Sequence, residues 1–292
     1  MPVAGGFSLA NTCGPVAWVG ERSPRHAWHG GTLRWVGWEG DRIVWRQACQ
    51  LMSGDLDIIG VASSSRDREW GSSVLGLDVA MPSFGDPLIG ELATRFPGLH
   101  PYSDGSLFDG IVTAIVGQSI SVASAAITQA KLAACYAEPI ELGGRAFRPL
   151  PTAHHLAESS VELIRSSGVT WKRAEGIRHA AREMIAGALP SDQDARAYPE
   201  EAVKVLMTLP LIGRWTAESA VLWGIGAPNA HPTGDIALLR AARRAYGRND
   251  MTLKDLDRLA DGWHPGRGLA ARLLWTNLFG PALDETSRGH DG

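Results

Sequence analysis

The chain has few cysteines, no long apolar run and no large excess of charge of one sign. Its three cysteines, Cys13, Cys49 and Cys135, are far apart and odd in number, which argues against a disulfide framework and against a cysteine-rich metal site. No apolar run reaches the roughly 18 residues that span a bilayer, and the N-terminus lacks the charged start and apolar stretch of a signal peptide. We therefore expect a cytoplasmic protein with no membrane partner.

The overall charge also limits the ways in which the chain can bind nucleic acid. A net charge of −3 argues against a protein that coats nucleic acid through its total charge, because that mode needs many phosphate contacts from Lys and Arg. Arginines nevertheless gather in the C-terminal part, at positions 240, 243, 244, 248, 258, 267 and 272. Such a run is either a solvated helix face or a surface that meets phosphate, and the sequence leaves both open.

A β-rich domain is predicted for residues 1–85. Residues 32–38 and 42–46 alternate between apolar and polar side chains and are interrupted by Gly30-Gly31 and by Gly40, which predicts antiparallel strands and a hairpin. Six of the 11 tryptophans precede residue 71. They are either the core of a small sheet or a stacking platform for bases, and the core interpretation is favoured.

A mostly helical core is predicted for residues 86–280. Residues 86–96 have a helical period, and the stretch 107–136 is rich in small residues, which suits two closely packed helices. Thr170 is expected to cap a helix over 171–189, and residues 191–197 are expected to form a polar connector. With a flexible tail at 281–292, the predicted fold class is α+β.

The most informative motif lies between residues 198 and 247. A helix is expected to end near Leu209, Pro210 to Gly213 form a tight turn, and a second amphipathic helix begins at about Arg214. A glycine in the turn lets backbone approach backbone, and the free N–H groups at the start of the second helix can hold a phosphate without a basic side chain. The same spacing also occurs in ordinary αα-hairpins.

The sequence LPLIGRWTA at 209–217, followed twenty residues after Trp215 by Asp235, resembles the helix-hairpin-helix (HhH-GPD) DNA glycosylase superfamily, most closely its 3-methyladenine DNA glycosylase II branch. The resemblance extends to LFDGIVTAIVGQSISVASAA at 107–126 and HPGRGLAARLLW at 264–275. It implies two helical subdomains with the active-site cleft between them, and double-stranded DNA as the partner. We expect a monomer that flips a modified base out of the duplex and hydrolyses its N-glycosidic bond.

The resemblance makes Asp235 the catalytic carboxylate. Cleavage of an N-glycosidic bond builds positive charge on the sugar, and a fixed carboxylate stabilises that charge and can orient the attacking water. The alternative is that Asp235, which follows Gly234, caps the next helix, and both roles can hold at once.

The resemblance also bears on strand cleavage and on cofactors. Branches that cleave the strand have a lysine where this chain has Trp215, and tryptophan offers no nucleophile, so an intact abasic site is expected. The cysteines of an iron–sulfur loop are missing, so no redox cofactor is expected. An alkali cation on backbone carbonyls near Gly213 is implied by the resemblance alone. His231 is interpreted as a loop residue before a proline, with a proton donor as the minor alternative, and His154-His155 as a helix-start pair, so no metal site is expected.

The remaining site residues also come from the resemblance. It implies substrate contacts at Gln118, Trp215, Ser219, Ile236 and Trp275. It implies DNA contacts at Ser119, Ile120, Leu211, Gly213, Arg214 and Thr216. Ser119 stands where a bulky apolar wedge is expected, so either Ile120 takes that role or the wedge is weak. Ser219 and Ile236 stand where aromatic rings are expected, which predicts a wider and less aromatic pocket.

Several functions remain open on these observations. The main expectation is excision of alkylated purines. The enlarged pocket would instead suit a bulkier base, such as a hypermodified pyrimidine in foreign (phage) DNA. A non-catalytic DNA-binding module and a helical scaffold for another protein explain fewer features, because neither needs Asp235 and Gln118.

Overall fold

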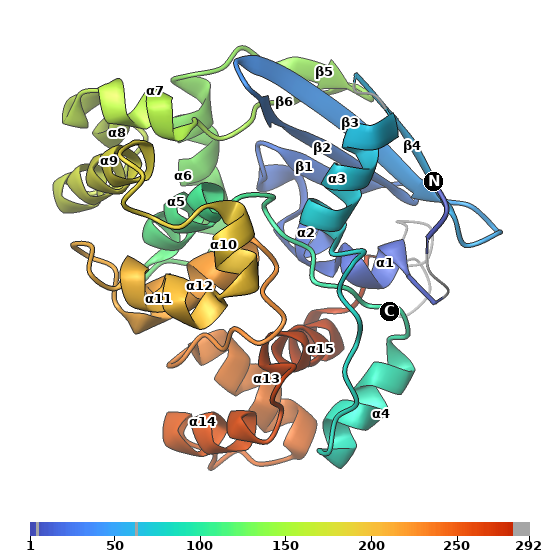
Figure 1. Cartoon of the computed structure of the whole chain (residues 1–292). Coiled ribbons are helices and arrows are strands. Elements are labelled where there is room, and N and C mark those ends of the chain that lie inside the picture. Colours follow the sequence, from blue (N-terminus) through green and yellow to red (C-terminus); the bar gives the residue numbers. More distant parts are fainter. Residues whose placement is uncertain (4–5, 62–63, 283–292) are drawn as a thin grey trace, which may run out of the picture.

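An antiparallel sheet forms the N-terminal part of the protein in the computed structural model, which describes residues 1–3, 6–61 and 64–282 (Figure 1). Its strands are β1 (His26–His29), β2 (Thr32–Glu39), β3 (Arg42–Gln50) and β4 (Leu56–Gly60), paired in the order β1-β2-β3-β4. Gly30, Gly31 and Gly40 have positive φ angles of 56°, 69° and 59°. These glycines make the tight turns that join the strands, so the predicted hairpins are confirmed.

Both faces of the sheet are covered. One face, with Leu33 and Val44, packs against helix α3 (Ser64–Leu75). The other face packs against a second hairpin, β5 (Ile140–Leu142) and β6 (Arg145–Phe147), through Val36 and Phe147. Trp35 and Trp70 lie in the core, 8% and 4% exposed, which confirms the core interpretation for these two tryptophans.

The first 85 residues contain more helix than the pattern predicted. Short helices α1 (Leu9–Thr12) and α2 (Gly14–Val19) and the 3-10 turn η1 (Gly20–Arg22) precede the sheet. They contribute Leu9, Cys13 and Val16 to the same core as α3. A single small sheet buries too little apolar surface alone, and these helices supply the missing layer.

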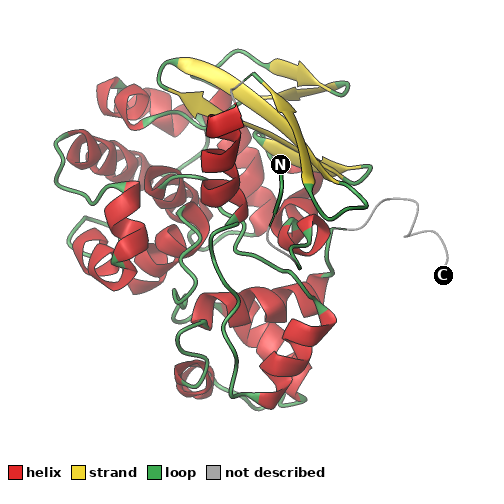
Figure 2. Ribbon diagram, turned by 45° about the vertical axis from the view of Figure 1, so that its right-hand side comes forward, coloured by secondary structure: helices red, strands yellow, loops and turns green. Residues whose placement is uncertain are grey.

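The rest of the chain is helical apart from β5 and β6, as Figure 2 shows. Side-chain caps explain several helix starts, including Asp86, Ser106, Ser121 and Thr170. Residues 191–197 were expected to form a connector, but Ser191 caps a short helix there. The helices are α4 (Pro87–Arg95), α5 (Leu107–Gly117), α6 (Val122–Ala134), α7 (Ala153–Glu158), α8 (Val161–Ser166), α9 (Trp171–Ile185), α10 (Asp192–Ala197), α11 (Pro199–Leu206), α12 (Arg214–Gly224), α13 (Ile236–Tyr246), α14 (Leu253–Asp261) and α15 (Arg267–Phe279).

Helices α5 and α12 pack backbone against backbone. A Cβ atom added at Gly110 would lie 2.2 Å from the Ala220 carbonyl oxygen, and one added at Gly224 would lie 2.7 Å from the Ser106 carbonyl oxygen. Only glycine permits this approach. These glycines therefore let α12 pack directly against α5. The two helices predicted for residues 107–136 are present as α5 and α6.

The helices form two groups, which Figure 1 shows above and below one another. Helices α5 to α12 lie beside the sheet, and α13, α14 and α15 pack with α4 in the lower group. The α+β prediction is confirmed. The domain boundaries at residues 85 and 280 stay predictions, and most of the expected tail lies outside the described residues. Within the described residues no helix is long and apolar enough to cross a membrane.

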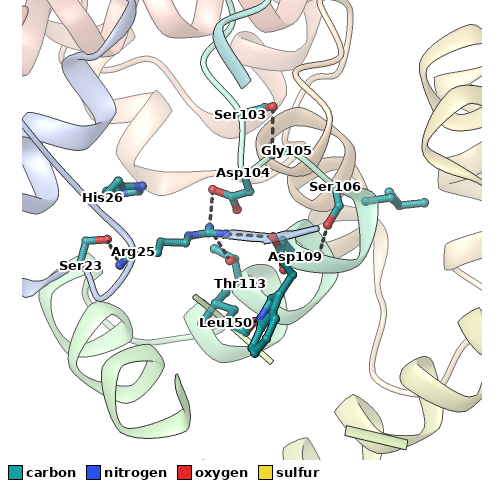
Figure 3. Close-up of polar contacts among 12 residues, drawn as sticks. Ser23, Arg25, His26, Ser103, Asp104, Gly105, Ser106, Asp109, Thr113 and Leu150 are labelled. Atoms are coloured by element: carbon teal, nitrogen blue, oxygen red, sulfur yellow. Dashed lines mark hydrogen bonds and ion pairs between the residues drawn. The ribbon is translucent and has the colours of Figure 1, made fainter. Parts of the chain in front are cut away.

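A buried ionic cluster joins the sheet to the helices (Figure 3). Arg25, just before β1, lies 2.5 Å from the Asp104 carboxylate and 3.2 Å from that of Asp109 on α5. It also donates to the Thr113 hydroxyl at 3.5 Å. Burial raises the pKa of Asp109 to about 7, against the opposing attraction of Arg25.

Candidate active site at the start of α13

The Asp235 carboxylate is held by two donors. One oxygen, Oδ1, accepts from the Leu238 backbone N–H at 2.7 Å, which makes Asp235 the N-cap of α13. The other oxygen, Oδ2, accepts from the Trp215 indole N–H at 2.9 Å. The predicted cap is confirmed, and the side chain remains partly exposed. A carboxylate fixed in this way presents its negative charge in one orientation.

The bond between Trp215 and Asp235 joins the two groups of helices. Trp215 lies in the first turn of α12, and Asp235 begins α13. Residues 225–235 connect the two helices, and this one side-chain hydrogen bond joins the start of α12 to the start of α13. The structure therefore brings together the two residues on which the sequence motif depends.

A second carboxylate, which sequence reasoning missed, supports the same connection. Glu218 lies one turn after Trp215 and is only 7% exposed. Its Oε2 accepts from the Thr233 backbone N–H at 2.7 Å, and its Oε1 accepts from Arg214 Nε at 2.9 Å. Because Thr233 is two residues from Asp235, Glu218 fixes the backbone that leads into Asp235. The signal available in the sequence was a glutamate flanked by two small residues, Ala217 and Ser219, within a predicted helix.

Gln118 ties the end of α5 to the hairpin. Its Nε2 donates to the Leu211 carbonyl at 2.9 Å and to the Thr216 hydroxyl at 3.0 Å. Arg173 on α9 donates to the Gln118 carbonyl. Gln118 thus lies at the junction of the two predicted DNA-contacting turns, and its amide N–H groups are already used within the protein.

Two non-glycine residues in these turns have left-handed backbone conformations. Ser119 has φ 56° and Leu211 has φ 69°. Such residues cost on the order of 1 kcal/mol or more and cluster at functional sites, where the surrounding structure holds them in place. Here Ser119 follows Gln118, and Leu211 accepts the Gln118 hydrogen bond. The strained residue of the hairpin is Leu211, whereas the sequence had drawn attention to Gly213.

The start of α12 is open. Gly213 is the N-cap of α12 with φ −80° and no side-chain cap, and an added Cβ would meet nothing within 4 Å. Arg214 and Gly213 are exposed, as are Ser119 and Ile120. Unpaired N–H groups at an exposed helix start form a site for an anion. The first helix ends at Leu206, three residues before the predicted end.

Other predicted site residues lie differently. Ser219 and Thr216 are buried, 3% and 4% exposed, whereas Ile236 is 67% exposed. Trp275 is 4% exposed and stacks on Trp223 at 5.3 Å between ring centroids, so it offers almost no ring surface to a base in this conformation. Its substrate contact stays a prediction.

The histidines take structural positions. His231 is buried, and its Nε2 lies 3.0 Å from Asp257 Oδ1 on α14. His155 forms a capping box with Thr152 at the start of α7. Within the described part of the chain, no group of three or more His, Cys, Asp or Glu residues is placed to hold a metal ion.

Known proteins are similar to this chain in sequence and in fold. No protein-family model matches the chain. The sequence is 32% identical over 194 residues to DNA-3-methyladenine glycosylase 2 of Escherichia coli (strain K12), covering 66% of each chain. It is 25% identical over 195 residues to DNA-3-methyladenine glycosylase of Bacillus subtilis (strain 168), covering 66% of this chain and 64% of that one. The chain thus spans slightly less than two thirds of these relatives.

The fold match is broader. The solved structure of a 3-methyladenine DNA-glycosylase from Archaeoglobus fulgidus superposes with a TM-score of 0.69 at 23% identity. It covers 94% of this chain and 93% of that one. The shared fold therefore includes the N-terminal sheet as well as the helical part.

Proposed function

Because the chain belongs to the helix-hairpin-helix DNA glycosylase superfamily, in its 3-methyladenine DNA glycosylase II branch, we propose that it excises a modified base from double-stranded DNA. The enzyme would flip the base out of the duplex and hydrolyse its N-glycosidic bond, leaving an abasic site. The observation that carries this proposal is the Asp235 carboxylate, fixed between the Leu238 N–H and the Trp215 indole N–H.

The reaction breaks the bond between the sugar C1′ and a base nitrogen. The electron pair leaves with the base, and positive charge develops on the sugar ring. Asp235 stabilises that charge and orients the water whose oxygen bonds to C1′, and that water releases one proton to the surrounding solvent. A carboxylate held by two donors needs little reorientation when the charge appears, which is the basis of electrostatic catalysis by fixed groups.

An alkylated purine is the base that this site suits best. Alkylation at a ring nitrogen makes the base electron-poor, so that it leaves without strong protonation. The one histidine near Asp235 in sequence, His231, bonds to Asp257 and is buried, so it is not presented as an acid for the leaving base. The names of the relatives agree with this substrate class. A bulkier pyrimidine has less support, because Ser219, one of the two residues expected to widen the pocket, is buried within α12.

The product is an intact strand with an abasic site. Strand cleavage by this superfamily would need an amine that attacks the sugar, and Trp215 has none. The four lysines of the chain, Lys131, Lys172, Lys204 and Lys254, are exposed on α6, α9, α11 and α14, and none lies within the segment 209–235 that contains Trp215 and Asp235. The Met1 amine donates to the Leu56 carbonyl beside the sheet. Borohydride should therefore trap no covalent adduct with DNA, and substantial trapping would show that the assignment is wrong.

DNA would be held by the two linked turns. The hairpin offers backbone N–H groups at Gly213 and beyond to a phosphate, and the exposed Ile120, rather than Ser119, supplies apolar surface for the gap left by the flipped base. Gln118 keeps the two turns in register. Glu218 acts as a positioning residue, since it touches the backbone before Asp235 and not the substrate.

The alkali cation expected at the hairpin stays a prediction. The Leu211 carbonyl already accepts from Gln118 Nε2, and the Leu209 carbonyl accepts from the Ile212 N–H at 3.3 Å. These contacts give the cation no positive support, and no step of the reaction is routed through it.

The proposed function is tested by the bases that the protein releases. Duplexes that carry alkylated purines, hypermodified pyrimidines or no modification are incubated with the protein, and the released bases are identified by mass spectrometry. We expect free alkylated purine and an intact abasic strand. Release of only a modified pyrimidine would replace the substrate class, and no release from any duplex would contradict the enzymatic function.

A further inference from the structure

An open groove of about 550 Å³ runs along one side of α13. Residues 236, 240, 243, 244 and 247 recur at helical spacing and so share one face of the helix. The groove is lined by Ile236, Leu239, Arg240, Arg243, Arg244, Gly247 and Asn249. It therefore combines an apolar floor with three guanidinium groups and contains no carboxylate.

The charge of this face is not neutralised locally. Arg240 and Arg244 are exposed, and neither guanidinium forms an ion pair or hydrogen bond with any residue that the structure describes. Arg243 is anchored by a bond from Nε to the Met251 carbonyl at 2.8 Å. Some other helix arginines pair with an acid one turn away, as Arg214 does with Glu218 and Arg95 does with Glu91. Helix α13 contains no acidic residue from Ile236 to Tyr246, in a chain whose net charge is −3.

The groove begins beside the catalytic position. Ile236, at one end, follows Asp235 directly and is 67% exposed. From Ile236 to Arg244 the helix rises by about 12 Å, at 1.5 Å a residue. At about 3.4 Å a nucleotide along one strand of a duplex, that length matches roughly three to four nucleotides. A strand whose nucleotide enters the site at Asp235 can therefore reach the arginines with its neighbouring phosphates.

We propose that this groove holds the phosphates of the DNA strand next to the flipped nucleotide, through the guanidinium groups of Arg240 and Arg244. It is a second phosphate site, separate from the hairpin. The hairpin binds through backbone N–H groups at a helix start, whereas the groove binds through side-chain charge and releases counterions. The proposal rests on DNA as the partner in the proposed function, and charge complementarity makes DNA its occupant. An acidic protein segment is the competing occupant.

The test removes the two charges and measures duplex binding over a range of salt concentrations. The variants are made in an Asp235→Asn background, so that base release does not enter the measurement. For Arg240→Gln/Arg244→Gln we expect the slope of log affinity against log salt to fall by about 1.8, because each lost phosphate contact is worth about 0.9. Affinity at about 0.1 M salt should fall tenfold or more.

Two control variants make the result specific. Arg42→Gln/Arg68→Gln removes the same charge from exposed positions on β3 and α3, far from α13 (Figure 1), and should leave the slope unchanged. Arg240→Lys/Arg244→Lys keeps the charge and should keep the slope. The proposal is overturned if Arg240→Gln/Arg244→Gln shows the same salt slope as Asp235→Asn alone. It is also overturned if that double variant binds DNA no more weakly than Arg42→Gln/Arg68→Gln.

The outcome is separate from that of the proposed function. If the α13 variants lower the salt slope and the unmodified protein releases no base from any duplex, the groove is supported and the glycosylase activity is contradicted. Base release by the parent together with unchanged binding by the α13 variants would support the activity and overturn the groove. Thermal unfolding confirms that each variant is folded, and the single variant Arg240→Gln should show about half the slope change.

Discussion

A negative charge at the start of α12 should raise stability and weaken DNA binding at once. Gly213 is the N-cap of α12, and its φ of −80° and ψ of 177° suit any residue. An added side chain meets nothing within 4 Å, so Gly213→Asp causes no clash and no backbone strain. Aspartate is a good N-cap and faces the positive end of the helix dipole. The folded protein should therefore be as stable as the parent, or more stable by a few tenths of a kcal/mol.

The added negative charge becomes unfavourable only when a DNA phosphate binds beside it. Two like charges about 4 Å apart repel by about 1 kcal/mol in water and by about 4 kcal/mol in a partly desolvated contact. Since about 1.4 kcal/mol is a factor of ten, affinity for any duplex should drop roughly tenfold or more. The preference for a modified base should change little, because backbone N–H groups on phosphate carry no sequence information.

Gly213→Asn is the matched control, because asparagine caps the helix with nearly the same shape and no charge. Binding of undamaged and lesion-bearing duplexes is measured by fluorescence anisotropy, and stability by thermal unfolding. The Gly213→Asn variant should bind DNA nearly as tightly as the unmodified protein, and the Gly213→Asp variant at least tenfold more weakly. If folded Gly213→Asp binds as tightly as Gly213→Asn, the hairpin does not contact phosphate.

Two further predictions concern the buried carboxylate of Glu218 and the partly buried carboxylate of Asp109. Glu218→Ala should lower the base-release rate at saturating DNA and destabilise the protein by about 1.5–3 kcal/mol, because the Thr233 N–H loses a charged acceptor. Glu218→Gln keeps one acceptor oxygen and should recover most of the rate. If Glu218→Ala releases base at the rate of the unmodified protein, the positioning role is refuted. The pKa of Asp109 is about 7 in the folded state and near 4 when unfolded, so its contribution to stability is complete below about pH 4 and is lost as the pH rises towards 7. Asp109→Asn should therefore flatten that fall in urea midpoint between pH 4 and 7, and an unchanged pH profile would contradict the role of Asp109.

Local sequence signals predicted much of the fold. The strands of the N-terminal sheet follow from strict alternation and glycine turns, and helix starts such as those of α9 and α13 follow from capping residues. The hairpin between β5 and β6 was missed although its signal was present. Gly143 and Gly144, with φ angles of 58° and 77°, form a two-residue turn that favours a hairpin.

The parts that were not predicted depend on contacts between distant segments. Nothing local shows that Gln118 reaches Leu211 and Thr216, or that Glu218 accepts from Thr233. The left-handed conformation of Leu211 is imposed by its surroundings and not by its residue type. Burial of Trp275 against Trp223 likewise depends on how α12 and α15 pack, so a residue list taken from a motif does not show which rings are open to a base.

The central claim is that Asp235 performs the chemistry and does not merely cap α13. Asp235→Asn keeps the shape of the side chain and an oxygen that can cap the Leu238 N–H, but it removes the charge. The measurement is the single-turnover rate of base release from a duplex carrying an alkylated purine, with DNA binding and thermal unfolding measured in parallel. The account predicts a folded variant that binds DNA and releases base at least about a hundredfold more slowly, the usual scale for a fixed electrostatic group. Release at the parent rate would show that Asp235 is only a helix cap.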